Sequence, residues 1–165
     1  MSDVTVEALP PVGMITLRGD LDTLGAAVAD VTGCDRPDQR LRTEAGDHGC
    51  LWMSPDELLV TCGYDAAPEI AARLTDALGD AFATVAVVSD ARAVFAMTGQ
   101  GAEAVLARLM PVDFDRMAPT EVRRTRMAQI PAALWREGEC WRVVCFRSVA
   151  GYAEGLLRNA VPIGA

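Results

Sequence analysis

Two stretches of this chain show the same succession of hydrophobic and polar positions. Each begins with an apolar run typical of a strand and continues with apolar residues at helical spacing. Two further strand patterns around a turn follow, and then a second helical pattern. In the first stretch these patterns lie at 12–18, 20–31, 48–53, 58–62 and 68–78. In the second they lie at 92–98, 101–109, 123–135, 140–146 and 149–157, and one more strand pattern, at 82–88, connects the two stretches.

These patterns predict one supersecondary unit that is used twice. Trp52 and Trp135 stand at corresponding points, each shortly before the turn between two strands. The first strands also correspond, because the runs 14–19 and 94–99 are both apolar and both end in a glycine before a helix. The order β-α-β-β-α in each unit predicts an α+β fold, in which helices pack on antiparallel sheets.

The ends and the length of the chain suggest how it is organised. Residues 1–11 end in two prolines and are expected to form a flexible arm. Residues 12–165 are expected to form a single domain of two repeated halves, about 12–90 and 91–160.

Several features predict a cytoplasmic protein. No apolar run approaches the length of about 18 residues that a membrane-spanning helix needs, so no membrane contact is expected. The first residues, Met1-Ser2-Asp3-Val4, are acidic where a signal peptide would be basic and apolar. The five cysteines have no framework spacing, which fits thiols that stay reduced in the cytoplasm.

Charge is distributed unevenly along the chain, whose net charge is -8. Residues 1–90 contain 16 acidic and 5 basic side chains, whereas residues 91–165 contain 7 acidic and 10 basic ones. Every basic residue is arginine, which fits a compositional bias and also suits a protein-binding surface, because arginine pairs with carboxylates through two hydrogen bonds. An acidic chain with one modest basic segment is not expected to bind nucleic acid.

That basic segment contains Arg123, Arg124 and Arg126, at the entry to an expected strand. One interpretation is a strand edge whose arginines form salt bridges with acidic residues of the first half. The other is a docking surface for an acidic partner. Pro131 lies within the same expected strand and lacks an N–H, so the strand should lie at an edge of its sheet or carry a bulge. Another chain can add to such an edge.

Candidate chemical sites are few. Gly99 and Gly101 lie between an expected strand and helix, where glycines let a nucleotide phosphate approach the helix N-terminus. The loop and hairpin that follow are not the parallel strand of a dinucleotide fold, so a tight turn is the simpler interpretation.

His48 and Cys50 share one face of an expected strand, and Cys62 follows on the next strand. Zinc needs three or four ligands, and recruiting Cys34 from the loop would be required to approach that number. The His48–Cys50 couple could also form a nucleophile and a base, although no orienting group is visible. Buried cysteines without a reactive role are the plainer interpretation.

Three pairs of acidic residues could act as acid and base, namely Asp56-Glu57, Asp113/Asp115 and Glu137/Glu139. All lie in expected turns or loops, where solvated carboxylates are common. The sequence therefore predicts no catalytic, cofactor-binding or metal-binding residue. A partner interface at Arg123, Arg124 and Arg126 is the single site that it suggests.

Several segments resemble the gamma subunit of heterotetrameric sarcosine oxidase, in the same order, over roughly residues 12–160. They are Trp52-Met53-Ser54-Pro55-Asp56-Glu57-Leu58-Leu59, Arg92-Ala93-Val94-Phe95-Ala96-Met97-Thr98-Gly99, Arg124-Thr125-Arg126-Met127-Ala128-Gln129-Ile130, Leu134-Trp135, and Phe146-Arg147-Ser148-Val149-Ala150 with Tyr152. None of these segments is a catalytic signature.

The resemblance implies a fold similar to the folate-binding domain of aminomethyltransferases, and a non-catalytic role in assembly. Such a complex demethylates sarcosine to glycine, forms hydrogen peroxide and passes the one-carbon unit to tetrahydrofolate. FAD, FMN, NAD and tetrahydrofolate would be held by partner subunits, and the alpha, beta and delta subunits would be the partners. The alternative is a stand-alone domain that binds a folate-like or nucleotide ligand between its halves, lined by the Gly99/Gly101 turn and by Trp52 or Trp135.

Overall fold

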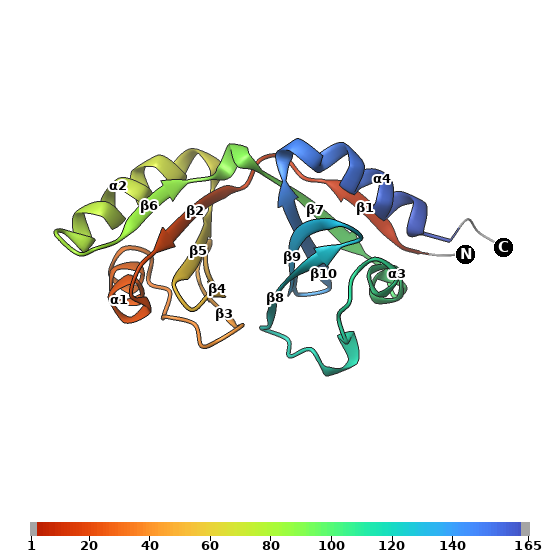
Figure 1. Ribbon diagram of the computed structural model, residues 1–165, viewed down its shortest axis with the longest axis horizontal. Coiled ribbons are helices and arrows are strands. Elements are labelled where there is room, and N and C mark those ends of the chain that lie inside the picture. Colours follow the sequence, from red (N-terminus) through yellow and green to blue (C-terminus); the bar gives the residue numbers. More distant parts are fainter. Residues whose placement is uncertain (1–2, 163–165) are drawn as a thin grey trace. The chain divides into compact units, whose positions relative to one another are not determined.

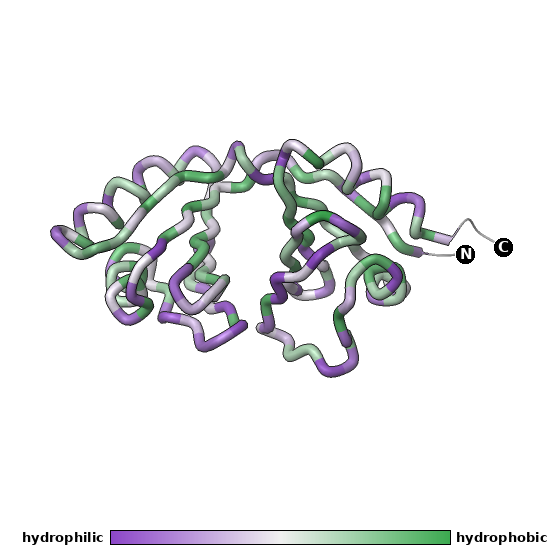
Figure 2. Tube along the Cα trace, viewed as in Figure 1, coloured by the Kyte–Doolittle hydropathy of each residue, from purple (hydrophilic) through white to green (hydrophobic). Residues whose placement is uncertain are grey.

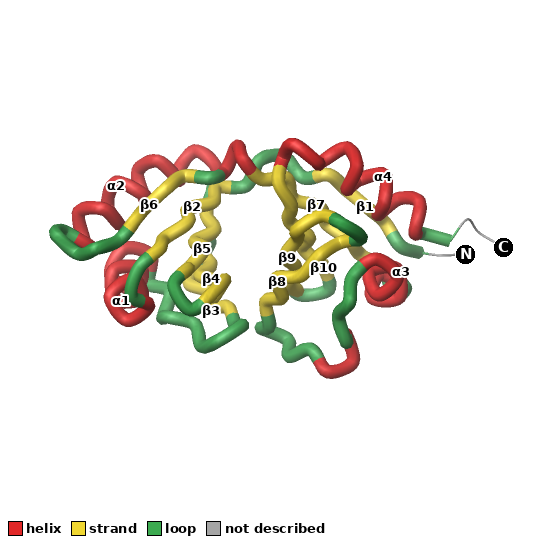
Figure 3. The backbone as a smooth tube through the Cα atoms, in the orientation of Figure 1, coloured by secondary structure: helices red, strands yellow, loops and turns green. Residues whose placement is uncertain are grey.

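The computed structural model describes residues 3–162 of the chain. It consists of two compact units, one formed by residues 11–89 and the other by residues 90–165 together with residues 1–10. We refer to them as the 11–89 unit and the 90–165 unit. Each unit contains one antiparallel sheet of five strands and two α-helices (Figures 1 and 3).

The 11–89 unit follows the predicted order of elements closely. Its sheet has the strand order β3-β4-β5-β2-β6. The elements are β2 (Gly13–Arg18), α1 (Leu21–Thr32), β3 (Arg42–Ala45), β4 (His48–Ser54), β5 (Glu57–Cys62), a 3₁₀ helix at Tyr64–Ala66, α2 (Ala67–Leu78) and β6 (Thr84–Val87). A further 3₁₀ helix, Ser89–Ala91, contains the residues at which the chain passes from this unit to the other. Local signals set the ends of α1: Asp20 caps its N-terminus, and Gly33 ends it in a left-handed conformation with a φ of 79°.

The 90–165 unit repeats this arrangement with strand order β1-β7-β10-β9-β8. Its elements are β1 (Thr5–Ala8), β7 (Arg92–Thr98), α3 (Ala102–Leu109), a 3₁₀ helix at Phe114–Arg116, β8 (Val122–Met127), β9 (Ile130–Glu137), β10 (Cys140–Phe146), a 3₁₀ helix at Arg147–Val149 and α4 (Ala150–Ala160). Two antiparallel sheets with helices confirm the predicted α+β class.

Each unit has its own hydrophobic core between its helices and one face of its sheet. In the 11–89 unit, Leu24 and Val28 of α1 pack with Ile15 and Leu17 of β2, and all four side chains are buried. In the 90–165 unit the corresponding core gathers buried residues of α3, α4 and the strands, including Phe95, Leu106, Leu134, Val143 and Leu157. Hydrophobic residues follow most of β2 in Figure 2, and this strand is largely buried. Burying such side chains contributes roughly 1.5–3 kcal/mol each, which makes these cores the main source of stability.

The segment expected to be a flexible arm contains a strand. Residues 5–8 form β1, which pairs antiparallel with β7, and Leu9 extends the pairing by donating its N–H to the carbonyl of Val94 at 2.9 Å. A four-residue strand that ends shortly before two prolines gives little periodicity, so its pattern alone does not reveal it. Residues 1–2 of the expected arm, and residues 163–165 of the expected domain, lie outside the described residues.

The single strand expected at 123–135 is two strands, which corrects the sequence interpretation. β8 and β9 form a tight antiparallel hairpin in which Met127 lies opposite Ile130. Ala128 makes the turn with a φ of 51°, and its N–H donates to the carbonyl of Leu109 at 2.8 Å. Alanine rarely adopts a positive φ, so the sequence carried none of the usual turn residues at this point.

No helix within residues 3–162 has the length and apolar character needed to cross a membrane. All five cysteines have free thiols.

Candidate interaction surfaces

The predicted arginine cluster lies on β8, an edge strand of its sheet. Residues alternate between the two faces of a strand. Arg123 lies opposite Leu134 on the core side, while Arg124 and Arg126 lie on the other face and are exposed. The three side chains therefore do not form one group, and only Arg124 and Arg126 share a face.

Arg123 has a partner within its own unit. Its Nε lies 2.5 Å from Oε1 of Glu121, which is itself largely buried. The second carboxylate oxygen of Glu121 accepts the N–H of Ala118 at 3.0 Å. Arg123 thus forms an ion pair beside the entry to β8. Arg126, near the other end of the strand, is exposed.

Pro131 lies on β9 and not on the arginine-bearing strand. It pairs with Arg126 of β8, and the first residue of β9 to pair with β10 is the next one, Ala132. Pro131 therefore lies where β9 has a strand on only one side, which suits a residue that cannot donate a ladder hydrogen bond.

The turn at Gly99 is filled by another part of the same unit. The backbone N–H of Gln100 donates to the carboxylate of Asp3 at 3.1 Å. Gly99 has a φ of 105°, and a Cβ at this position would overlap the carbonyl oxygen of Asp3. The glycine therefore allows close approach of Asp3, in the place where a nucleotide phosphate would lie next to the glycine turn.

His48 and the cysteines have structural environments. A ring nitrogen of His48, Nδ1, lies 3.3 Å from the carbonyl oxygen of Thr32. Cys50 is fully buried, and desolvation, with a smaller effect of nearby Cys34, raises the pKa of its thiol to about 12. Such a thiol is almost entirely protonated at neutral pH and is not an activated nucleophile. Within the described residues, no three His, Cys, Asp or Glu side chains are grouped to hold a metal ion.

Two of the three acidic pairs engage arginines. Arg18 contacts both members of the first pair, at 3.1 Å from Asp56 and 2.9 Å from Glu57. A hydrogen bond from Ser54 is the largest cause that lowers the pKa of Asp56, and the charge of Arg18 lowers it further. In the β9–β10 hairpin, Glu137 accepts a hydrogen bond from Arg142 at 2.8 Å and one from the indole of Trp135 at 2.7 Å. Asp113 and Asp115 line a separate hollow beside α3.

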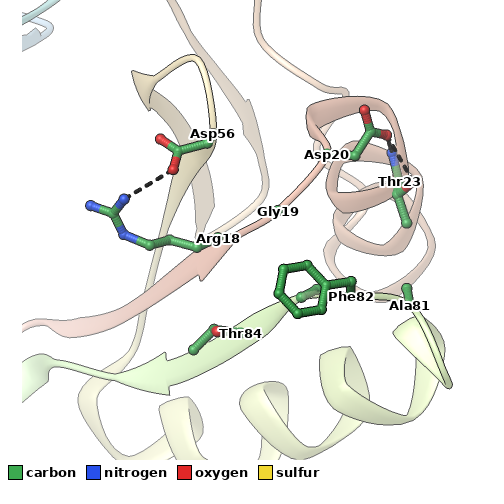
Figure 4. A pocket seen from close by; sticks show the side chains of 9 residues that line it. Arg18, Gly19, Asp20, Thr23, Asp56, Ala81, Phe82 and Thr84 are labelled. Carbon is green, nitrogen blue, oxygen red and sulfur yellow. Dashed lines mark hydrogen bonds and ion pairs between the residues drawn. The ribbon is translucent and has the colours of Figure 1, made fainter.

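A feature that the sequence did not reveal is an open hollow at the end of β2. Its volume is about 530 Å³, and its lining residues are Arg18, Gly19, Asp20, Thr23, Asp56, Ala81, Phe82, Ala83 and Thr84. Phe82 is completely exposed, with a relative accessibility of 102%. Figure 4 shows Arg18 with Asp56 on one side, Asp20 with Thr23 on the other, and the ring of Phe82 below and between them.

The negative charge of this hollow is fixed by hydrogen bonds. Asp20 accepts the backbone N–H and the hydroxyl of Thr23, at 2.9 and 2.8 Å. These two bonds lower the pKa of Asp20, so that its carboxylate stays ionised. The hollow therefore combines ionised carboxylates with an exposed aromatic ring, a residue type that is enriched at protein interfaces.

Comparisons with known proteins place the chain among sarcosine oxidase subunits. No family model matches the chain. A curated sarcosine oxidase subunit gamma from Corynebacterium sp. strain P-1 is 36% identical over 119 residues, which cover 69% of this chain and 57% of that protein. A sarcosine oxidase subunit gamma from Arthrobacter sp. is 32% identical over 139 residues, which cover 81% of this chain and 66% of that protein.

Two solved structures extend the comparison. A chain of the heterotetrameric sarcosine oxidase of Corynebacterium sp. U-96, in complex with pyrrole 2-carboxylate, matches with a TM-score of 0.87 and 27% identity, covering 96% of this chain and 83% of that chain. Aminomethyltransferase T of the glycine cleavage system from Bartonella henselae matches with a TM-score of 0.75 and 12% identity, covering 94% of this chain and 45% of that chain. The second match concerns the fold alone.

The chain thus has an α+β fold that is also found in an aminomethyltransferase. It belongs to the family of sarcosine oxidase gamma subunits. The aligned part spans 57–66% of the length of the curated relatives.

Proposed function

We propose that this chain is a non-catalytic subunit of a heterotetrameric sarcosine oxidase and contributes to assembly. The observation that carries the proposal is the sequence match to curated gamma subunits, at 32–36% identity. A chain of a heterotetrameric sarcosine oxidase supports it with a structural match that covers 96% of this chain. The environments of two candidate chemical groups support a non-catalytic role. Cys50 is a buried, protonated thiol, and Asp3 fills the turn at Gly99.

The reaction and its cofactors then belong to the complex. The alpha, beta and delta subunits are the proposed partners, and they would hold FAD, FMN, NAD and tetrahydrofolate. Together they would oxidise sarcosine to glycine, with formation of hydrogen peroxide and transfer of the one-carbon unit to tetrahydrofolate. A cytoplasmic location suits the five free thiols.

The arginines of β8 are proposed as one of the contacts with a partner. Arg126 is exposed on an edge strand, where an acidic segment of another subunit could reach both its charge and the open strand edge. Replacing Arg126 by glutamate should weaken assembly, whereas Arg116→Glu, at an exposed position in the same unit, serves as a matched control of charge.

The alternative of a stand-alone binder of a folate-like or nucleotide ligand has less support, because Asp3 occupies the glycine turn that would face a phosphate. Titration of the isolated chain with tetrahydrofolate, followed by calorimetry, separates the two proposals. The assembly role predicts no heat of binding to the isolated chain.

Deletion of the coding sequence in the native host tests the assembly role. Sarcosine oxidation in lysates should fall, and the flavin-containing complex should shift to a lower mass or lose partner subunits. Complementation with the wild-type chain should restore both. An unchanged complex with full activity in the deletion strain would overturn the proposal.

A further inference from the structure

The two units allow a residue-by-residue comparison of two edge strands, β1 and β6. Thr84 of β6 lies opposite Arg18, the residue before Gly19. Thr5 of β1 lies opposite Thr98, the residue before Gly99, and both pairings run antiparallel. In this common register the strand Thr5-Val6-Glu7-Ala8 corresponds to Thr84-Val85-Ala86-Val87.

The first difference is a missing charge. Exposed edge strands usually carry charged side chains that prevent another strand from adding to them. In the described part of the chain, β3 carries Arg42 and Glu44, β8 carries three arginines, and β1 carries Glu7. β6 carries no charged residue, and Ala86 stands where β1 has Glu7.

The second difference lies two residues before each strand. In β1 this position is Asp3, whose carboxylate accepts the N–H of Gln100 and fills the turn after β7. In β6 it is Phe82, whose carbonyl oxygen would lie 3.1 Å from a Cβ placed on Gly19, so its backbone follows the same path. The side chain of Phe82, unlike that of Asp3, makes no such closing contact and is fully exposed.

Phe82 and β6 together form an exposed apolar surface. The run Ala81-Phe82-Ala83-Thr84-Val85-Ala86-Val87-Val88 has no charge, proline or glycine, and β6 is hydrophobic along its length in Figure 2. Thr84, Ala86 and Val87 are exposed, and Val87 has 46% relative accessibility. Within the described residues only β2 pairs with β6, so its other edge has no strand partner there. Such a surface in a native protein indicates an interaction site.

The surroundings define the charge of the partner. The hollow beside Phe82 is bordered by the carboxylates of Asp20 and Asp56, and Arg18 is already paired with Asp56. Residues 11–89 contain 13 acidic side chains against 5 arginines, so the whole unit has a strong negative field. A second copy of the same unit would bring the same negative charge to the contact, which opposes pairing of two copies.

We infer that β6 and Phe82 form a docking edge for an extended, positively charged segment of another polypeptide. The segment pairs its backbone with the open edge of β6, packs an apolar side chain on Phe82 and places lysine or arginine near Asp20 and Asp56. The inference rests on the proposed function, since the polypeptide is a partner subunit of the same complex, and it identifies where that subunit binds.

Co-purification of the sarcosine-oxidising flavoprotein with tagged versions of this chain, expressed in the native host, tests the inference. Phe82→Ala and Ala86→Lys should each lower the recovered flavoprotein by about tenfold or more, as expected for a residue central to an interface. Two control variants introduce the same residues at other positions. Tyr152→Ala shortens another exposed aromatic residue, and Glu7→Lys places lysine at the β1 position that corresponds to Ala86. Both should recover as much flavoprotein as wild type.

The identity of the bound segment is tested with the photoreactive residue benzoylphenylalanine at position 82. Illumination should crosslink it to a partner segment that contains lysine or arginine. Crosslinking to a second copy of this chain would overturn the inference, as would full recovery with Phe82→Ala and Ala86→Lys, or equal loss with Glu7→Lys. If the wild-type chain recovers no flavoprotein, the proposed function fails. If the wild-type chain recovers flavoprotein but the variants do not differ from it as stated, only the docking edge is refuted. Because Phe82 is fully exposed, Phe82→Ala should keep the unfolding midpoint of wild type.

Discussion

The carboxylate of Asp3 accepts a hydrogen bond from the backbone N–H of Gln100, at 3.1 Å, although 97 positions separate the two residues. The bond fixes the beginning of β1 against the turn between β7 and α3. The chain's first strand is thereby held in the sheet of the 90–165 unit, and the glycine turn has no room for an additional group.

Gly99→Ala should destabilise this unit. The residue has a φ of 105°, and a methyl group there would overlap the backbone of Asp3. We expect a loss of about 1–3 kcal/mol in the free energy of unfolding, measured with urea. Gly63→Ala is the matched control, because Gly63 has a φ of -61° and no atom within 4 Å of the added methyl group. Equal stability of the two variants would contradict the closed turn.

Gly155→Ala should stabilise the protein. Gly155 lies in the middle of α4, and a methyl group at this position would meet no atom within 4 Å. Alanine is favoured over glycine in a helix interior by about 1 kcal/mol. The urea midpoint should rise by a corresponding amount. A fall in the midpoint would mean that the outer surface of α4 is not open as described.

Asp20→Ala should weaken the start of α1 in a pH-dependent way. The folded-state pKa of Asp20 is lowered by its bonds to Thr23, so its contribution to stability is present above its unfolded pKa and is lost as the pH falls through the folded pKa. The stability gap between wild type and Asp20→Ala should therefore narrow as the pH falls from neutral into the acid range. Asp20→Ser, which keeps a capping oxygen but has no titrating group, should stay close to wild type at neutral pH. A gap independent of pH would rule out the ionised cap.

Iodoacetamide should label the cysteines of the native protein in an order set by burial. Cys140 is partly exposed, whereas Cys50 is fully buried and has a pKa of about 12. Because the thiolate is the reacting form, Cys50 should react at neutral pH only after unfolding. Peptide mass spectrometry after timed labelling would show Cys140 modified first. Rapid modification of native Cys50 would restore it as a candidate nucleophile.

The sequence predicted the long, periodic elements well, and it missed short or atypical ones. The runs 58–62 and 92–98 are apolar and continuous, and they became β5 and β7 nearly to the residue. β1 was missed because four residues ending shortly before two prolines have little pattern of their own, and its pairing with β7 is a long-range contact. The β8–β9 turn was missed because Ala128 and Gln129 are not typical turn residues.

The candidate interaction surfaces were only partly visible in the sequence. The arginines of 123–126 stood out by charge, but pairing of Arg123 with Glu121 depends on how the loop before β8 folds. Phe82 gave no signal, because an apolar residue beside a strand is normally taken as part of the core. Its exposure depends on how the chain folds around β6, and the corresponding residue before β1, Asp3, instead closes a turn with its side chain. The internal repeat therefore supplied the comparison that periodicity could not.

Purification of the tagged chain from its native host, under gentle conditions, shows whether the chain works as part of a larger enzyme. We expect a flavin-coloured complex to elute with the chain and to oxidise sarcosine, and we expect no oxidation by the chain purified alone. Elution of the chain by itself, or turnover of sarcosine by the isolated chain, would contradict an assembly role.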